Sequence, residues 1–136
     1  MRSVCLGCVV VALSLTFGCS NGPKLVPVKG KLTNAGKPVL ADKKGGITLV
    51  FLPVVEGGKA TTTYSGLFNP EDNTFEVAGP DGKGIPAGKY KVSLMAMSMN
   101  SSPAIEKLNE QYSTAKSKIV VDVTGADVDI DLSKYQ

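Results

Sequence analysis

Two patterns of apolar and polar residues follow one another along this chain. Residues 4–17 are apolar apart from one glycine and two hydroxyl residues, and no charge follows Arg2 until Lys24. After Lys24, apolar and polar residues alternate in short runs separated by Gly, Pro, Asn and Asp. An alternation with a period of two is typical of half-buried β-strands. The sequence therefore predicts an apolar leader followed by a β-rich domain.

Seven short strands are expected in this domain. The run 47–52 is nearly all apolar between Gly46 and Pro53, which favours a strand at the centre of a sheet. Pro27 has no N–H to donate, so we expect the first strand to lie at a sheet edge, at least in its first half. The strands are predicted over residues 26–33, 47–52, 61–68, 74–77, 89–96, 118–123 and 127–132.

One short helix is expected after the fifth strand. Ser102 can cap its N-terminus, and Pro103 suits its first turn. Ile105, Leu108 and Tyr112 then follow at i, i+3 and i+7 and would share one face. Seven short strands with at most one helix favour an all-β fold, a β-sandwich.

The turns and core positions of this domain also resemble a known family. The matching stretches are Gly30-Lys31-Leu32-Thr33, Gly36-Lys37-Pro38-Val39, residues 47–53 and Pro86-Ala87-Gly88-Lys89-Tyr90-Lys91-Val92. Over residues 25–132 they resemble the carboxypeptidase regulatory-like, or transthyretin-like, domain. The nearest pattern is that of small secreted bacterial lipoproteins built from one such domain. The resemblance implies a seven-stranded Greek-key β-sandwich, transthyretin-like or Ig-like, and no shared active site.

The leader has the features of a bacterial secretory signal. Arg2 precedes an apolar run of about fourteen residues, which as a helix spans roughly 21 Å at ~1.5 Å per residue. A bilayer core of ~30 Å needs about twenty apolar residues, so a cleaved signal helix is favoured over a permanent transmembrane helix. Only Ala12-Leu13-Ser14 approaches the small-residue pattern of an ordinary cleavage site, and cleavage there would shorten the apolar run.

Gly18-Cys19 closes the apolar run and resembles the lipobox of bacterial lipoproteins. In that family the cysteine thiol is diacylated, and the preceding signal is then removed. The resemblance implies that Cys19 is the lipid attachment site, although Leu15 stands one position earlier than the leucine usual in the family. The alternative is a free cysteine at the end of a plain signal or anchor. Cys8 is a poorer candidate, because almost no apolar run precedes it.

The chain is thus expected to have three parts. Residues 1–18 form a lipoprotein signal peptide, residues 19–24 the lipidated cysteine and a tether, and residues 25–136 the β-sandwich domain. Two or three acyl chains exceed the two-signal threshold for stable membrane anchoring. We expect a lipid anchor in the cell membrane or the outer membrane, with the domain facing the periplasm or the exterior.

Composition narrows the functions that the domain can have. All three cysteines, Cys5, Cys8 and Cys19, lie in the leader or at its edge, so we expect a fold without disulfides. The 15 basic residues are Arg2 and 14 lysines, and the chain from Cys19 on therefore carries 14 positive against 12 negative charges, a net of +2. These charges are scattered, and neither arginine nor Trp accompanies them. Nucleic acid is therefore not an expected partner.

The chain contains no histidine. This absence removes Ser-His-Asp and Cys-His nucleophiles, histidine general bases and the usual zinc ligand sets. No spacing of carboxylates nominates a glycosidase-like pair. We therefore expect a protein that is not an enzyme and that holds no cofactor.

Met95, Met97 and Met99 alternate with smaller residues and would share one side of a strand. Thioethers suit Cu(I). Methionine is also a common filler of core gaps, and this segment can pack under the predicted helix. Because no Cys or His accompanies the three thioethers, the structural interpretation is favoured.

Asp127, Asp129 and Asp131 also share one predicted strand face. Three carboxylates can hold Ca²⁺, but an EF-hand loop needs Gly at its sixth position, where this chain has Leu132, and Glu at its twelfth. The favoured interpretation is the solvated face of a late strand, whose charges discourage edge-to-edge association.

The sequence therefore favours a lipid-anchored, non-enzymatic β-sandwich that binds or supports a partner in the bacterial cell envelope. That partner would be a protein or a glycan, met by loops or by a sheet edge. The alternative is an envelope protein that binds a small ligand or a metal, either Cu(I) at the methionines or Ca²⁺ at the aspartates.

Overall fold

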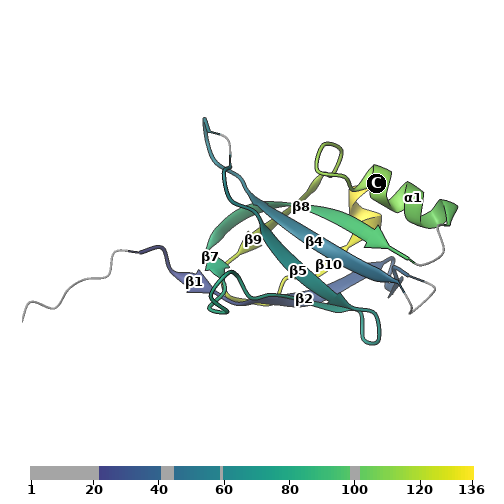
Figure 1. Cartoon of the computed structure of the whole chain (residues 1–136), viewed down its shortest axis with the longest axis horizontal. Coiled ribbons are helices and arrows are strands. Elements are labelled where there is room, and N and C mark those ends of the chain that lie inside the picture. The colour runs from purple at the N-terminus through teal and green to yellow at the C-terminus, as the bar shows by residue number, and fades with distance from the viewer. Residues whose placement is uncertain (1–21, 41–44, 59, 99–101) are drawn as a thin grey trace, which may run out of the picture.

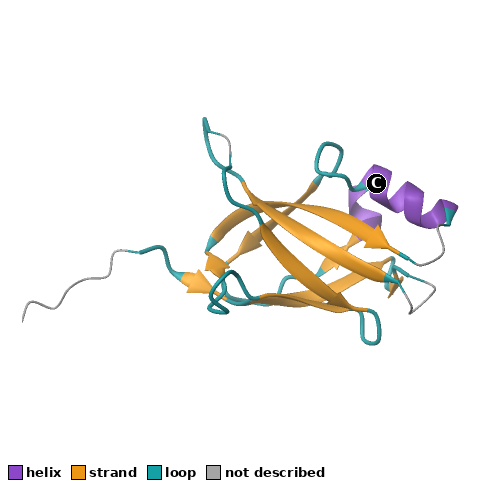
Figure 2. Ribbon diagram, in the orientation of Figure 1, coloured by secondary structure: helices purple, strands orange, loops and turns teal. Residues whose placement is uncertain are grey.

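The structure is a computed structural model that describes residues 22–40, 45–58, 60–98 and 102–136. These residues form ten strands, one α-helix and one 3₁₀-helix (Figures 1 and 2). Their bounds are β1 Leu25–Val26, β2 Val28–Asn34, β3 Lys37–Pro38, β4 Gly46–Pro53, β5 Tyr64–Asn69, β6 Thr74–Val77, β7 Ile85–Pro86, β8 Gly88–Met97, α1 Pro103–Gln111, β9 Ile119–Val123, β10 Ile130–Asp131 and η1 Leu132–Tyr135.

One large sheet dominates the fold, with strand order β10-β2-β6-β5-β4-β8-β9 and β3 paired to β2. Its neighbours are antiparallel except for β10 and β2, which run parallel. The sheet curls into a half-barrel around the core (Figure 2). β1 and β7 form a separate two-stranded sheet. The predicted all-β, sandwich-like fold with one short helix is confirmed, and the sequence missed only short strands such as β3 and β7.

The inward face of the half-barrel is built by the predicted alternation. Along β8, Tyr90, Val92, Leu94 and Ala96 are buried, and Lys89 and Met95 are exposed. β4 lies between β5 and β8, as expected for the most apolar strand, and buries Ile47, Leu49 and Phe51. Its other apolar residues are only half-buried, because they point to the outer face. Only one face of β4 therefore packs into the hydrophobic core, although apolar residues occupy both faces of the strand.

Pro27 separates two strands, and the predicted edge is confirmed, because β1 and the first half of β2 each pair with a strand on one side only. β1 before it pairs with β7, and β2 after it pairs with β6, so the chain changes sheets where it lacks a backbone donor. The first half of β2 has no strand on its other side. There Lys29 C=O accepts from Val128 N–H at 2.8 Å, and Lys31 N–H donates to Asp129 Oδ1 at 2.9 Å. The edge expected at Pro27 is thus covered by an irregular segment.

Gly30 permits this close approach. A side-chain Cβ at this position would overlap the backbone carbonyl of Val128. Val128 itself is buried in the core. The absence of a side chain at residue 30 therefore lets the segment before β10 lie flat against β2.

The last predicted strand, residues 127–132, is mostly replaced by other structure. Only Ile130–Asp131 pairs as a strand, and η1 follows at once. Asp131 explains the change, because its side chain accepts from Ser133 N–H at 3.1 Å and caps η1. The expected strand over 61–68 likewise begins later, at Tyr64.

Helix α1 agrees with the prediction and covers an open stretch of β8. Ser102 caps its N-terminus and Pro103 lies in its first turn. Beyond Val92, β8 has no strand partner on the side away from β4. The Asn109 side chain pairs there with both backbone groups of Ala96, at 2.6 and 2.9 Å, and Tyr112 C=O accepts from Leu94 N–H. The helix therefore substitutes for a missing strand.

Candidate functional site

The predicted lipid attachment site, Cys19, lies outside the described residues. Five residues, 20–24, separate it from the first residue of β1, Leu25. Where the described chain begins, Lys24 C=O accepts from Ala87 N–H at 3.1 Å. The last residue of the expected tether is therefore already bonded to the domain. Within the described residues, no helix is both long and apolar enough to cross a membrane.

The aspartates keep the predicted solvent-facing side, opposite the buried Val128, Ile130 and Leu132. Most of the segment is not a strand, however, and two of the aspartates bond to the backbone of β2 or of the turn after it. Asp129 Oδ1 accepts from Lys31 N–H. Asp131 Oδ1 accepts from Ala35 N–H at 2.8 Å, and also from the N–H and hydroxyl of Ser133. Asp127 lines a groove described below. The carboxylates of Asp129 and Asp131 thus accept hydrogen bonds from β2 and the turn after it, where the backbone carbonyls of a neighbouring strand would otherwise accept them.

The Asp131 hydrogen bonds make stability depend on pH. The backbone N–H of Ala35, followed by the hydroxyl and N–H of Ser133, holds the pKa of Asp131 below its ordinary value of 3.8. The folded state therefore favours the charged form, and the stabilisation is complete above the unfolded pKa and is lost as pH falls through the folded pKa.

We expect Asp131→Asn to reduce the loss of stability between about pH 6 and about pH 3 relative to the parent chain. Urea midpoints at both pH values measure this. Asp72→Asn is an independent second variant, since Thr74 lowers the pKa of that carboxyl in a separate turn. Each substitution should reduce the pH dependence of stability, and the double variant should show the sum of the two reductions. Identical pH profiles for Asp131→Asn and the parent would contradict the assignment.

The methionines lie on the outer face of the sheet. Met95 is 55% exposed and Met97 is 61% exposed. The segment packs against α1 as expected, through the Asn109–Ala96 hydrogen bonds. The methionine side chains do not fill core gaps, because β8 turns its even-numbered residues inward. Met99 lies outside the described residues. Two thioethers therefore share one exposed face, with no cysteine among the described residues to accompany them.

A row of residues in register crosses the outer face of five strands. Lys29 lies opposite Glu76, Glu76 opposite Leu67, Leu67 opposite Thr48, and Thr48 opposite Met95. The β2 end of the row is charged, with Lys29 Nζ 3.3 Å from Glu76 Oε1. The β8 end is apolar and exposed.

A groove of about 1040 Å³ covers the charged half of this row, over β2, β6 and β5. The aspartate segment beside β2 borders it on one side, and the turn after β6 borders it on another. Its outward-facing lining residues include Lys29, Lys31, Ser65, Leu67, Thr74, Glu76, Asp127 and Asp129. Lysines and carboxylates line the groove together with apolar side chains such as Tyr64, Leu67 and Phe68, which suits a ligand with both polar and apolar faces.

The sequence did not single out this groove. The period-two pattern placed Lys29, Lys31 and Glu76 on the polar side of their strands, and that part is confirmed. Which strands lie side by side depends on pairing between distant segments, and no local pattern encodes it.

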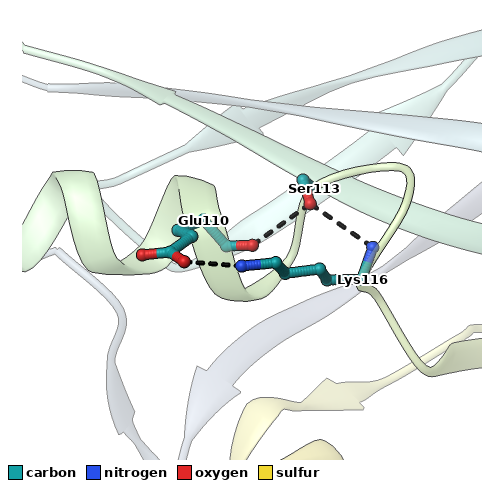
Figure 3. Close-up of polar contacts among 3 residues, drawn as sticks. All are labelled: Glu110, Ser113 and Lys116. Carbon is teal, nitrogen blue, oxygen red and sulfur yellow. Dashed lines mark hydrogen bonds and ion pairs between the residues drawn. The ribbon is translucent and has the colours of Figure 1, made fainter.

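Glu110 in the last turn of α1 forms a polar cluster with Ser113 and Lys116, which follow the helix (Figure 3). Ser113 Oγ donates to the Glu110 carbonyl at 3.1 Å and accepts from Lys116 N–H at 3.4 Å. Lys116 Nζ lies 2.5 Å from Glu110 Oε1 and lowers the pKa of that carboxyl. The lysine amine thus contacts the carboxylate and the hydroxyl bonds to backbone, so the cluster closes a turn and does not pair a nucleophile with a base.

No group of three metal-ligating carboxylate, thiol or imidazole side chains gathers anywhere in the described part of the chain. No family model, curated protein or solved structure matches the sequence or the fold.

Proposed function

We propose that this chain is a lipid-anchored, non-enzymatic module of the bacterial cell envelope, with acyl chains at Cys19. The observation that carries the proposal is the position of Cys19, which ends an apolar run and is separated from β1 by five residues. A modified Cys19 would hold the half-barrel directly at a membrane surface.

The groove over β2, β6 and β5 is the surface on which the module would meet its partner. Its floor is rigid, because every strand beneath it is paired in the large sheet. Its lysines, carboxylates and aromatic side chains suit a glycan or a stretch of protein in the envelope. We also propose that the domain is transthyretin-like, as its turns and core positions suggest. A curled, mostly antiparallel sheet is compatible with that family.

Non-enzymatic binding is supported by how the polar side chains are used. Asp129, Asp131 and Asn109 bond to strand backbone. Ser113 bonds to the turn after α1, and the Ser117 hydroxyl donates to the Val92 carbonyl. These five polar side chains therefore hold the fold together.

Cys19→Ser tests the proposal. We expect the substitution to prevent acylation, so that the protein leaves the membrane fraction or accumulates with its leader attached. Membrane sedimentation and intact-protein mass spectrometry measure these outcomes, and the parent chain should be heavier than its cleaved polypeptide by the mass of its acyl groups.

Cys8→Ser is the matched control, since Cys8 also follows a glycine within the leader. It should leave both membrane retention and mature mass unchanged. Membrane retention of Cys19→Ser at the parental level, with no change in mass, would overturn the proposal.

A further inference from the structure

The expected tether limits how far the domain can stand from a membrane. An extended chain covers at most ~3.6 Å per residue, so Leu25 lies within about 22 Å of Cys19. Acyl chains at Cys19 would place that residue at the level of the lipid headgroups. The end of the domain that carries β1 must then face the bilayer.

The β4–β5 loop lies at this same end. Val54, its first residue, donates its N–H to Lys89 C=O at 2.9 Å, at the start of β8. Two residues earlier, Ala87 N–H donates to Lys24 C=O at 3.1 Å, beside β1. Figure 1 shows the loop and the N-terminal segment at one end of the half-barrel, with α1 and the C-terminus at the other.

Large apolar side chains are exposed at this end. Val54 and Val55 are 52% and 51% exposed in the loop, and Leu25 is 40% exposed in β1. They are three of the seven large apolar residues that are exposed in the described part of the chain. Two adjacent valines in a projecting loop can enter an apolar phase without any rearrangement of the core. Their transfer out of water is favourable.

Charges of both signs flank these residues along the chain. Lys24, Lys83 and Lys89 stand against Glu56, Asp81 and Asp122, and Lys59 adds one further positive charge to the β4–β5 loop. Lys89 lies opposite Asp122 across β8 and β9. Because the excess is a single charge, apolar contact is the larger force expected at this surface.

We propose that the end of the domain marked by Leu25, Val54 and Val55 rests on the bilayer, with the two valines in the headgroup region. This inference rests on the proposed acylation of Cys19. It gives the anchored domain a fixed orientation, in which the end carrying α1 points away from the membrane.

An environment-sensitive fluorophore on an introduced cysteine tests this orientation. The full-length chain is expressed with Val55→Cys, purified in its processed form, labelled and incorporated into phosphatidylcholine vesicles. Acylation would occupy the Cys19 thiol, so the introduced cysteine is the only free thiol of the mature chain. Met97→Cys is the matched control, because Met97 is similarly exposed at the far end of the β4–β8 pair.

We expect the label at residue 55 to shift its emission to the blue and to be quenched by spin-labelled lipid, while the label at residue 97 stays water-like. Adding phosphatidylglycerol should not increase either effect. A water-like label at residue 55 on vesicle-bound protein, or a shift at residue 97 instead, would overturn the orientation and leave the anchor intact. Vesicle binding that survives Cys19→Ser would instead overturn the proposed function.

Discussion

Gly30→Ala is expected to lower the free energy of unfolding by about 3 kcal/mol or more. The added Cβ would overlap the Val128 carbonyl, and a backbone group, unlike the end of a flexible side chain, can yield only if its whole segment moves. That movement would break the Val128–Lys29 hydrogen bond and the bond from Lys31 to Asp129. It would also withdraw Val128 from the core.

Thermal unfolding measures this effect. At roughly 4 °C per kcal/mol for a domain of this size, the melting temperature should fall by about 12 °C or more. Gly46→Ala is the matched control, because its Cβ would meet nothing within 4 Å at the start of β4. Equal melting temperatures for the two variants would show that the segment beside β2 is not held as described.

Phe51→Ala should have an effect of similar or greater size, a loss of about 3–5 kcal/mol. Phe51 is fully buried at the centre of the half-barrel. Its ring centroid lies 6.0 Å from that of Phe75 and 6.2 Å from that of Tyr90, so one side chain joins β4, β6 and β8. Truncation to alanine leaves a cavity among strands whose hydrogen bonds prevent them from collapsing into it.

Urea unfolding measures the loss for Phe51→Ala. Phe51→Leu should cost less, because it leaves a smaller cavity. Val120→Ala, on the exposed side of β9, should change the free energy by no more than about 1 kcal/mol. If all three variants unfolded at the same urea concentration, the aromatic centre would not be the core of the fold.

The strands that sequence reasoning located well are those with a one-sided pattern. Tyr90, Val92 and Leu94 alternate with polar or exposed residues, so the pattern along the strand agrees with the side that each residue faces in the fold. The helix was also predictable, because Ser102 and Pro103 mark its start and Leu108 lies on its inward face.

The features that were missed depend on contacts between distant segments. Nothing near Asp129 or Asp131 in the sequence reveals that their carboxylates bond to backbone about a hundred residues earlier. Alternation at residues 127–132 predicted a strand, but side chains took the hydrogen bonds that a strand would have used. Met95 and Met97 were expected to have structural partners, yet the partner of this stretch, α1, contacts the strand backbone and leaves both side chains exposed.

The groove lies between these two cases. Lys29, Lys31 and Glu76 were correctly placed on the polar side of their strands, but the order β2-β6-β5 that brings them together follows from non-local pairing.

Asn109 presents both a donor and an acceptor to Ala96, as a peptide unit of a neighbouring strand would. A single amide on a helix therefore terminates the hydrogen-bond ladder at the far end of β8, where another molecule of the same protein would otherwise find a template. On a membrane surface, where the proposed acylation of Cys19 would concentrate the protein, this capped strand end would guard against fibril growth.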